Sequence, residues 1–148
     1  MLSAKAKYGL KAALYLAERE GEGGILVSDI AESQRIPKKF LDTILLELKN
    51  KGLLSSKKGK GGGYMLARPS SKVMVGQIVR ILDGPIAPVS CVSQTAYRPC
   101  TDCSSEEACR IRRVMQRVRD ATAEILDNTS LRDMATAPRP PTVLNYDI

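Results

Sequence analysis

Residues 37–66 read PKKFLDTILLELKNKGLLSSKKGKGGGYML, and their hydrophobic period changes once, near Gly52. Before this glycine, apolar residues recur at the spacing of one helix face: Phe40, Leu41, Ile44, Leu45 and Leu48. After it, apolar and polar residues alternate on both sides of a glycine- and lysine-rich segment at 57–63. The stretch predicts a helix that has Pro37 as its first residue and Gly52 as its C-terminal cap, followed by a β-hairpin over 53–67.

Three further helices are predicted around this stretch. An amphipathic pattern covers 3–20, a short helix is expected to start at an N-capping Ser28, and another pattern covers 72–83. Three helices followed by a hairpin define the winged form of helix-turn-helix, in which the third helix enters the major groove of DNA. The expected fold is therefore mainly α with a small β-hairpin, and we assign residues 1–84 to a DNA-binding domain.

The basic side chains are concentrated in the same half of the chain. Residues 1–75 hold 14 of the 23 lysines and arginines but only 7 of the 16 acidic residues. This segregation is typical of proteins that bind a polyanion, although a charge run can also be only a solvated face. The predicted DNA-binding residues of the third helix and the hairpin are Lys38, Lys39, Asp42, Thr43, Lys57, Lys58, Lys60, Gly61 and Tyr64.

A loop predicted at 85–106 and the residues just after it contain all four cysteines of the chain: Cys91, Cys100, Cys103 and Cys109. Four thiolates within nineteen residues can complete a zinc site or supply the ligands of a [2Fe–2S] or [4Fe–4S] cluster, and the spacing does not decide between them. A disulfide between Cys100 and Cys103, formed on oxidation, is a further alternative. Cys109 is expected at the start of a helix, where the dipole stabilises a thiolate.

A long helix is predicted after the loop, over 107–134. Its apolar residues step by three and four, as in a coiled coil: Ile111, Val114, Val118, Ala121 and Ile125. We expect this stripe to join two copies of the chain. The proline-containing tail at 135–148 has no period and is predicted to be disordered.

Several other classes of protein fit the sequence less well. The chain contains no histidine, which excludes Ser-His-Asp and Cys-His catalytic sets and argues against an enzyme.

The first residues form no hydrophobic block, so we predict a cytoplasmic protein without a membrane segment. A small electron carrier would account for the cysteines but leaves the basic hairpin without a purpose.

The segment Gly52–Leu66, supported by Lys5–Leu10, resembles the Rrf-type (IscR/NsrR-like) family of winged helix-turn-helix transcription regulators. The resemblance runs from Leu2 to Met134 and implies a homodimer, joined through the long helix, on a palindromic duplex operator. It also implies that Lys58 enters the minor groove.

For the cysteines, the resemblance implies an iron–sulfur cluster that tunes operator binding. The fourth ligand varies within the family. The position of its histidine ligand is Arg112 here, so ligation by all four thiolates is the simplest expectation, with Asp102, Glu106 or Glu107 as substitutes for one cysteine. The alternative is a cluster-free DNA-binding regulator with structural zinc or a thiol/disulfide switch.

Overall fold

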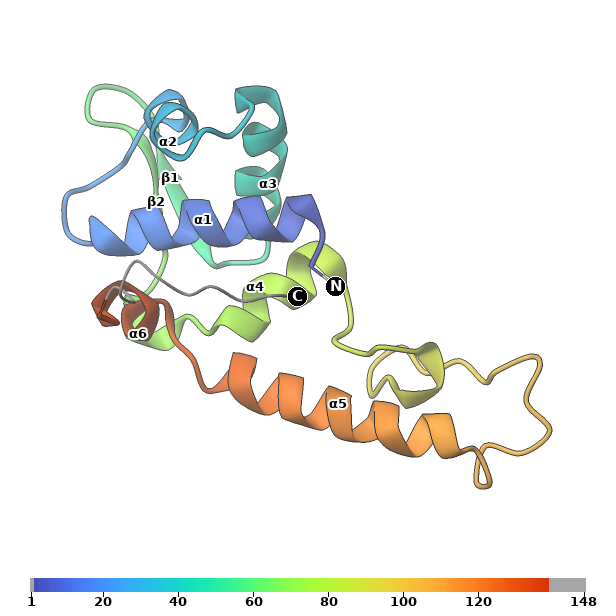
Figure 1. Ribbon diagram of the computed structural model, residues 1–148. Helices are drawn as coiled ribbons and strands as arrows, with labels where there is room; N and C mark the ends of the chain where they lie inside the picture. The colour runs from blue at the N-terminus through green and yellow to red at the C-terminus, as the bar shows by residue number, and fades with distance from the viewer. Residues whose placement is uncertain (1, 139–148) are drawn as a thin grey trace.

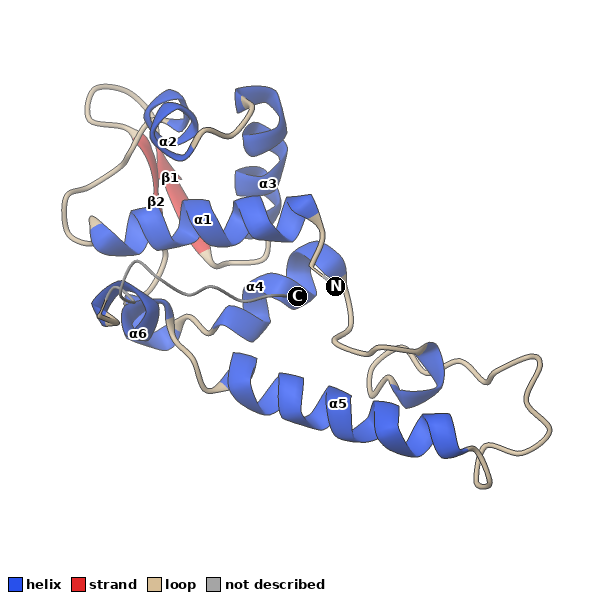
Figure 2. Cartoon of the chain, viewed as in Figure 1, coloured by secondary structure: helices blue, strands red, loops and turns tan. Residues whose placement is uncertain are grey.

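The computed structural model describes residues 2–138. It is mainly helical, with one two-stranded antiparallel sheet in this range, as the sequence predicts (Figure 2). The elements, in chain order, are α1 (Ala4–Glu18), α2 (Val27–Gln34), α3 (Lys38–Asn50), β1 (Leu54–Lys57), β2 (Gly63–Leu66), η1 (Ser70–Lys72), α4 (Val75–Asp83), η2 (Ser90–Val92), α5 (Arg110–Asp127) and α6 (Leu131–Thr136). No helix in the described range is both long and apolar enough to cross a membrane.

The chain forms a head and an arm (Figure 1). The head contains α1 to α4, the hairpin and α6, while α5 runs along one side of it and carries the cysteine loop at its far end. Helix α1 lies at the centre of the head, in contact with α3, α4 and α6.

The predicted apolar face of α3 forms much of the head's core. Leu41, Ile44, Leu45 and Leu48 are fully buried, as the spacing predicts. Phe40, predicted on the same face, is instead 37% exposed and meets the ring of Tyr8 edge-on, with 5.6 Å between ring centroids. One side of α3 therefore anchors the helix and leaves the opposite side free.

The ends of α3 differ little from the prediction. Pro37 occupies the N-cap position rather than the first helical position. At the other end Gly52 has a φ of +80°, and the following N–H, of Leu53, donates to the carbonyl of Leu48 at 3.0 Å. This left-handed turn ends the helix and leads the chain into β1.

The predicted N-cap of α2 is wrong, because Ser28 lies inside the first turn and no side chain caps the helix. The chain is fixed just upstream instead. Ile25 and Tyr64 exchange backbone hydrogen bonds of 2.9 and 2.8 Å, which ties the segment before α2 to the edge of β2. The start of α2 is therefore positioned by a tertiary contact rather than by a local one.

The hairpin forms as the sequence predicts, and its two strands pair with Leu54 opposite Leu66 and Ser56 opposite Tyr64. Its turn depends on Gly62, where an added Cβ would overlap the carbonyl oxygen of Lys57. Glycine is required there because the backbone folds tightly onto itself.

Two predicted helices have different limits in the structure. The helix expected over 72–83 begins only at Val75, after the 3-10 turn η1. The stretch expected to be one helix over 107–134 is divided into α5 and α6, because Ser130 and Asp133 form a capping box that starts a new helix. Residues 135 and 136 of the predicted disordered tail belong to α6, and 139–148 lie outside the described residues.

Candidate DNA interface and cysteine loop

The outer end of α3 carries the polar residues predicted to read DNA. Lys38, Lys39 and Thr43 are exposed, and Asp42 is half-buried. The ammonium of Lys38 lies 3.2 Å from the Asp42 carboxylate, one helical turn away. This exposed pair contributes little stability, so either side chain can exchange its partner for a nucleic-acid group.

A tight turn between α2 and α3 sets the direction of α3. Arg35 is the only non-glycine residue in the described range with a positive φ, of 53°. The next residue, Ile36, is buried, and its N–H donates to Ala31 at 2.9 Å. The turn is thus anchored in the core, and α3 is held at a fixed angle to α2.

The hairpin tip presents the basic residues of the wing. Lys57, Lys58, Lys60 and Gly61 are all exposed. In Figure 1 the tip lies at the same end of the head as α2, on the side away from α5. The structure thus places exposed lysines of the wing and the free side of α3 on one head.

Tyr64 differs from the other predicted DNA-binding residues, because its ring packs against the core and is half-buried. Burial, and secondly the negative charge of Asp42, raise the pKa of its hydroxyl above the ordinary value. Tyr64 therefore belongs to the part of the hairpin that packs on the head, unlike the exposed lysines of the tip.

The four cysteines are free thiols in different surroundings. Cys91 is buried in η2, whereas Cys100 is exposed. Cys103 and Cys109 are half-buried. Cys109 lies at the start of α5, as the sequence predicts, and its sulfur accepts from the N–H of Arg112 at 3.4 Å. Within residues 2–138, no three Cys, Asp or Glu side chains are gathered closely enough to hold a metal ion.

Acidic residues of the loop are engaged with neighbours. The thiol of Cys100 donates to Asp102 at 3.0 Å, and this bond, together with contact with Cys103, raises the pKa of Cys100 to about 12. Cys100 and Cys103 are therefore brought together. The hydroxyl of Tyr97 donates to Glu106 at 2.7 Å, so neither Asp102 nor Glu106 is a free ligand here.

Helix α5 has an apolar stripe that no other part of residues 2–138 covers. None of its residues is buried. Every member of the predicted stripe is exposed, Ile111 and Ile125 to 67% and 66%. A stripe of this length on a long helix is typical of an interface with another chain.

Sequence reasoning missed the contacts that hold the arm. Arg119 donates to the carbonyl of Val92 at 2.6 Å and ties η2 to α5. Arg80 of α4 and Asp127 at the end of α5 form a two-point ion pair. An arginine and an aspartate 47 positions apart give no signal in one sequence.

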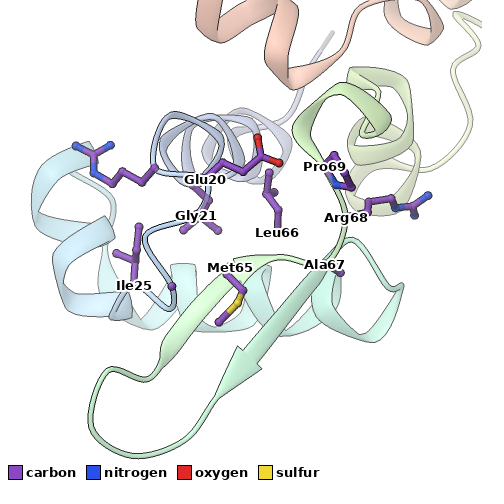
Figure 3. Close-up of a pocket in the computed structure, with 11 residues that line it drawn as sticks. Glu20, Gly21, Ile25, Met65, Leu66, Ala67, Arg68 and Pro69 are labelled. Atoms are coloured by element: carbon purple, nitrogen blue, oxygen red, sulfur yellow. The ribbon is translucent and has the colours of Figure 1, made fainter.

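A pocket of about 370 Å³ lies between the end of α1 and β2 (Figure 3). It is lined largely by apolar and backbone groups, including Gly21, Ile25 and Leu66. The carboxylate of Glu20 accepts from the N–H and hydroxyl of Ser70, at 2.8 and 2.6 Å. None of the predicted site residues lines this pocket.

Three helices, α1 to α3, followed by a basic hairpin define a winged helix-turn-helix protein. The family model described as Rrf2, iron-dependent transcriptional regulator, matches residues 2–137. The chain belongs to the Rrf2 family of DNA-binding transcription regulators, and it is not an enzyme.

Related proteins align with nearly the whole length of this chain. An rrf2-like HTH-type transcriptional regulator of Rhodobacter capsulatus is 41% identical over 150 residues, covering 99% of this chain and 100% of the relative. The structure of CymR, the global cysteine regulator of Bacillus subtilis, is 34% identical, with a TM-score of 0.77 over 92% of this chain and 96% of the other. The structure of T. potens IscR is 30% identical, with a TM-score of 0.72 over 90% and 85% of the two chains.

Proposed function

We propose that this chain is a cytoplasmic, homodimeric regulator that binds a palindromic operator, and that its cysteine loop holds an iron–sulfur cluster that tunes this binding. The observation that carries the DNA-binding surface is the exposure, on one head, of the α3 side chains and the wing lysines. Lys38, Lys39, Asp42 and Thr43 enter the major groove, while the wing lies on the sugar-phosphate backbone and the minor groove beside it.

The two elements have different tasks. The lysines of the wing neutralise phosphates and release condensed counterions, which supplies affinity for any duplex. Gly61 lets the wing backbone lie close to the sugar-phosphate chain. Asp42 can accept a hydrogen bond from cytosine N4, so α3 supplies sequence preference.

Salt dependence of DNA binding tests the assignment of the wing. Replacing Lys57, Lys58 and Lys60 by alanine is expected to weaken binding to all duplexes. The slope of log K against log salt is expected to become less steep by up to about 2.7, because three phosphate contacts are lost. A charge-matched control replaces Arg110, Arg113 and Lys72, which are exposed and have no ion pair among the described residues. Equal slopes for the two triple variants would contradict the assignment.

The uncovered stripe of α5 supports the homodimer. Its members recur every three or four residues, so two copies of α5 can pack side by side with their apolar residues interleaved. This arrangement covers the apolar stripe of both α5 helices. It also places one DNA-binding head opposite each half-site of the palindromic operator.

The donor set of the loop fits a thiophilic metal or cluster by its chemistry. Cys91 is buried at the start of the loop, Cys100 interacts with Cys103, and Cys109 lies at the start of α5, so all four thiols belong to the loop or its boundary with the helix. Cys91, Cys100, Cys103 and Cys109 would hold the group. When bound, an iron–sulfur cluster supplies sensitivity to iron and oxidants.

The protein's own residues then connect the loop to DNA binding. Cys109 leads directly into α5, and the bond from Arg119 to Val92 ties the beginning of the loop to the middle of the same helix. A change in the loop therefore shifts the helix that joins the two protomers. This shift alters the orientation of the two DNA-binding heads relative to each other.

A cluster-free regulator with a structural zinc ion or a thiol/disulfide switch is the second candidate. The contact between Cys100 and Cys103 favours the switch. Iron, sulfide and zinc analysis of anaerobically purified protein separates these candidates: matched iron and sulfide support a cluster, and zinc or no metal supports the alternative.

A further inference from the structure

The joint between the head and the arm consists of two sets of contacts. Arg80 in α4 places its two terminal nitrogens 2.5 and 2.8 Å from the two carboxylate oxygens of Asp127, the last residue of α5. Beside this pair, the N–H of Val75 donates to Thr129 and that of Leu131 donates to Val73, both at 2.9 Å. The joint therefore combines a two-point ion pair with a short stretch of backbone hydrogen bonding.

The packing around the ion pair leaves little freedom. A Cβ added at Gly76 would overlap the carboxylate of Asp127 and lie 2.9 Å from a terminal nitrogen of Arg80. The pKa of Asp127 is lowered, chiefly by the hydrogen bond from Arg80, so the carboxylate is ionised at neutral pH. A planar guanidinium bonded at two points fixes direction as well as distance.

We infer that the Arg80–Asp127 pair is a positioning contact that sets the spacing between half-sites that the dimer accepts. The inference rests on the proposed dimer through α5. The pair holds each head at one angle to its own α5, so two packed α5 helices hold the two heads at one separation and one rotation. Arg80 itself does not touch DNA in this account.

The geometry of DNA makes this selectivity measurable. One inserted base pair moves one half-site by about 3.4 Å and turns it by about 35° relative to the other. Heads held rigidly on α5 cannot follow this change without losing contacts. Heads released at the joint can follow it, at the cost of some affinity for the correct spacing.

The test compares dimer affinity for a matched palindrome, for the same palindrome with one base pair added, and for a single half-site. Arg80→Ala and Asp127→Ala are expected to reduce the ratio between matched and lengthened sites by about fivefold to tenfold, because a partly exposed two-point pair is lost. Affinity for the half-site stays unchanged. The control is Arg113→Ala, which removes an exposed arginine from α5, the helix that also contains Asp127.

Exchange of the two charges keeps the test independent of folding. Arg80→Asp combined with Asp127→Arg restores the pair in reverse and is expected to recover at least part of the lost spacing selectivity. If Arg80→Ala keeps the wild-type ratio while the wild type discriminates between spacings, the inference is overturned and the dimer stands. If the wild type binds both palindromes equally, the inference is likewise overturned and the dimer stands. If the wild type is a monomer, the proposed dimer and the inference are both overturned.

Discussion

Introducing a charge in the centre of the α5 stripe tests whether this face joins two copies of the chain. Val118→Asp changes the middle residue of the stripe. The exposed fractions of Ile111, Val114, Val118 and Ile125 are 67%, 52%, 43% and 66%, which together amount to more than two complete apolar side chains. Covering them on both protomers contributes about 7–14 kcal/mol before the cost of association.

The cost of association leaves only a small margin. Loss of translational and rotational freedom costs about 4–15 kcal/mol, similar to the gain from the stripe. The aspartate removes one apolar contact from each protomer and buries two like charges near each other, which costs several kcal/mol. We expect the dimer dissociation constant to rise at least about 100-fold.

Sedimentation analysis at several protein concentrations measures this change, with Arg113→Asp as the control on the same helix. Because α5 contributes no buried residue, the circular dichroism of the head should be unchanged, and binding to a half-site should persist. A Val118→Asp protein that remains dimeric at micromolar concentration would refute the assignment of the interface.

Three further predictions concern the head. Asp42→Ala should change preference among operator sequences by about 1–3 kcal/mol at one position, with little change on non-specific duplexes, as measured by competition binding. Gly62→Ala should destabilise the wing, because the new Cβ meets the Lys57 carbonyl, and should weaken DNA binding more than it lowers the melting temperature. Glu20→Gln should cost about 1 kcal/mol at pH 7, because hydrogen bonds from Ser70 lower the pKa of Glu20. This deficit, measured by urea unfolding, should begin to shrink as the pH falls below about 4.5, where Glu20 of the unfolded chain becomes protonated, and should disappear below the lowered pKa of the folded carboxylate.

The sequence was sufficient for features that depend on local periodicity. The buried face of α3 and the presence of the hairpin follow from apolar spacing and from glycine positions. These patterns are visible because each helix or strand must bury one face against the core.

Features set by tertiary contacts were not predictable in this way. The start of α2 is fixed by pairing between Ile25 and Tyr64, so the local signal at Ser28 was misleading. The division between α5 and α6 accompanies a bridge between Ser130 and Met74, far away in sequence. Single-sequence reasoning has no means of pairing such distant segments.

The candidate site shows the same division. Exposure of the wing lysines and the place of Cys109 at the start of a helix follow from local sequence. The burial of Cys91 and the pairing of Tyr97 with Glu106 do not, because they depend on how the loop packs against α5.

If the cysteine site holds a cluster that tunes operator binding, occupancy of the site must change operator affinity. This is measured at equal salt, under anaerobic conditions, for protein with measured iron and sulfide and for the same protein stripped of metal. We expect matched iron and sulfide in the first sample and an affinity difference of about tenfold or more between the two. Equal affinity of the loaded and stripped proteins would contradict this expectation.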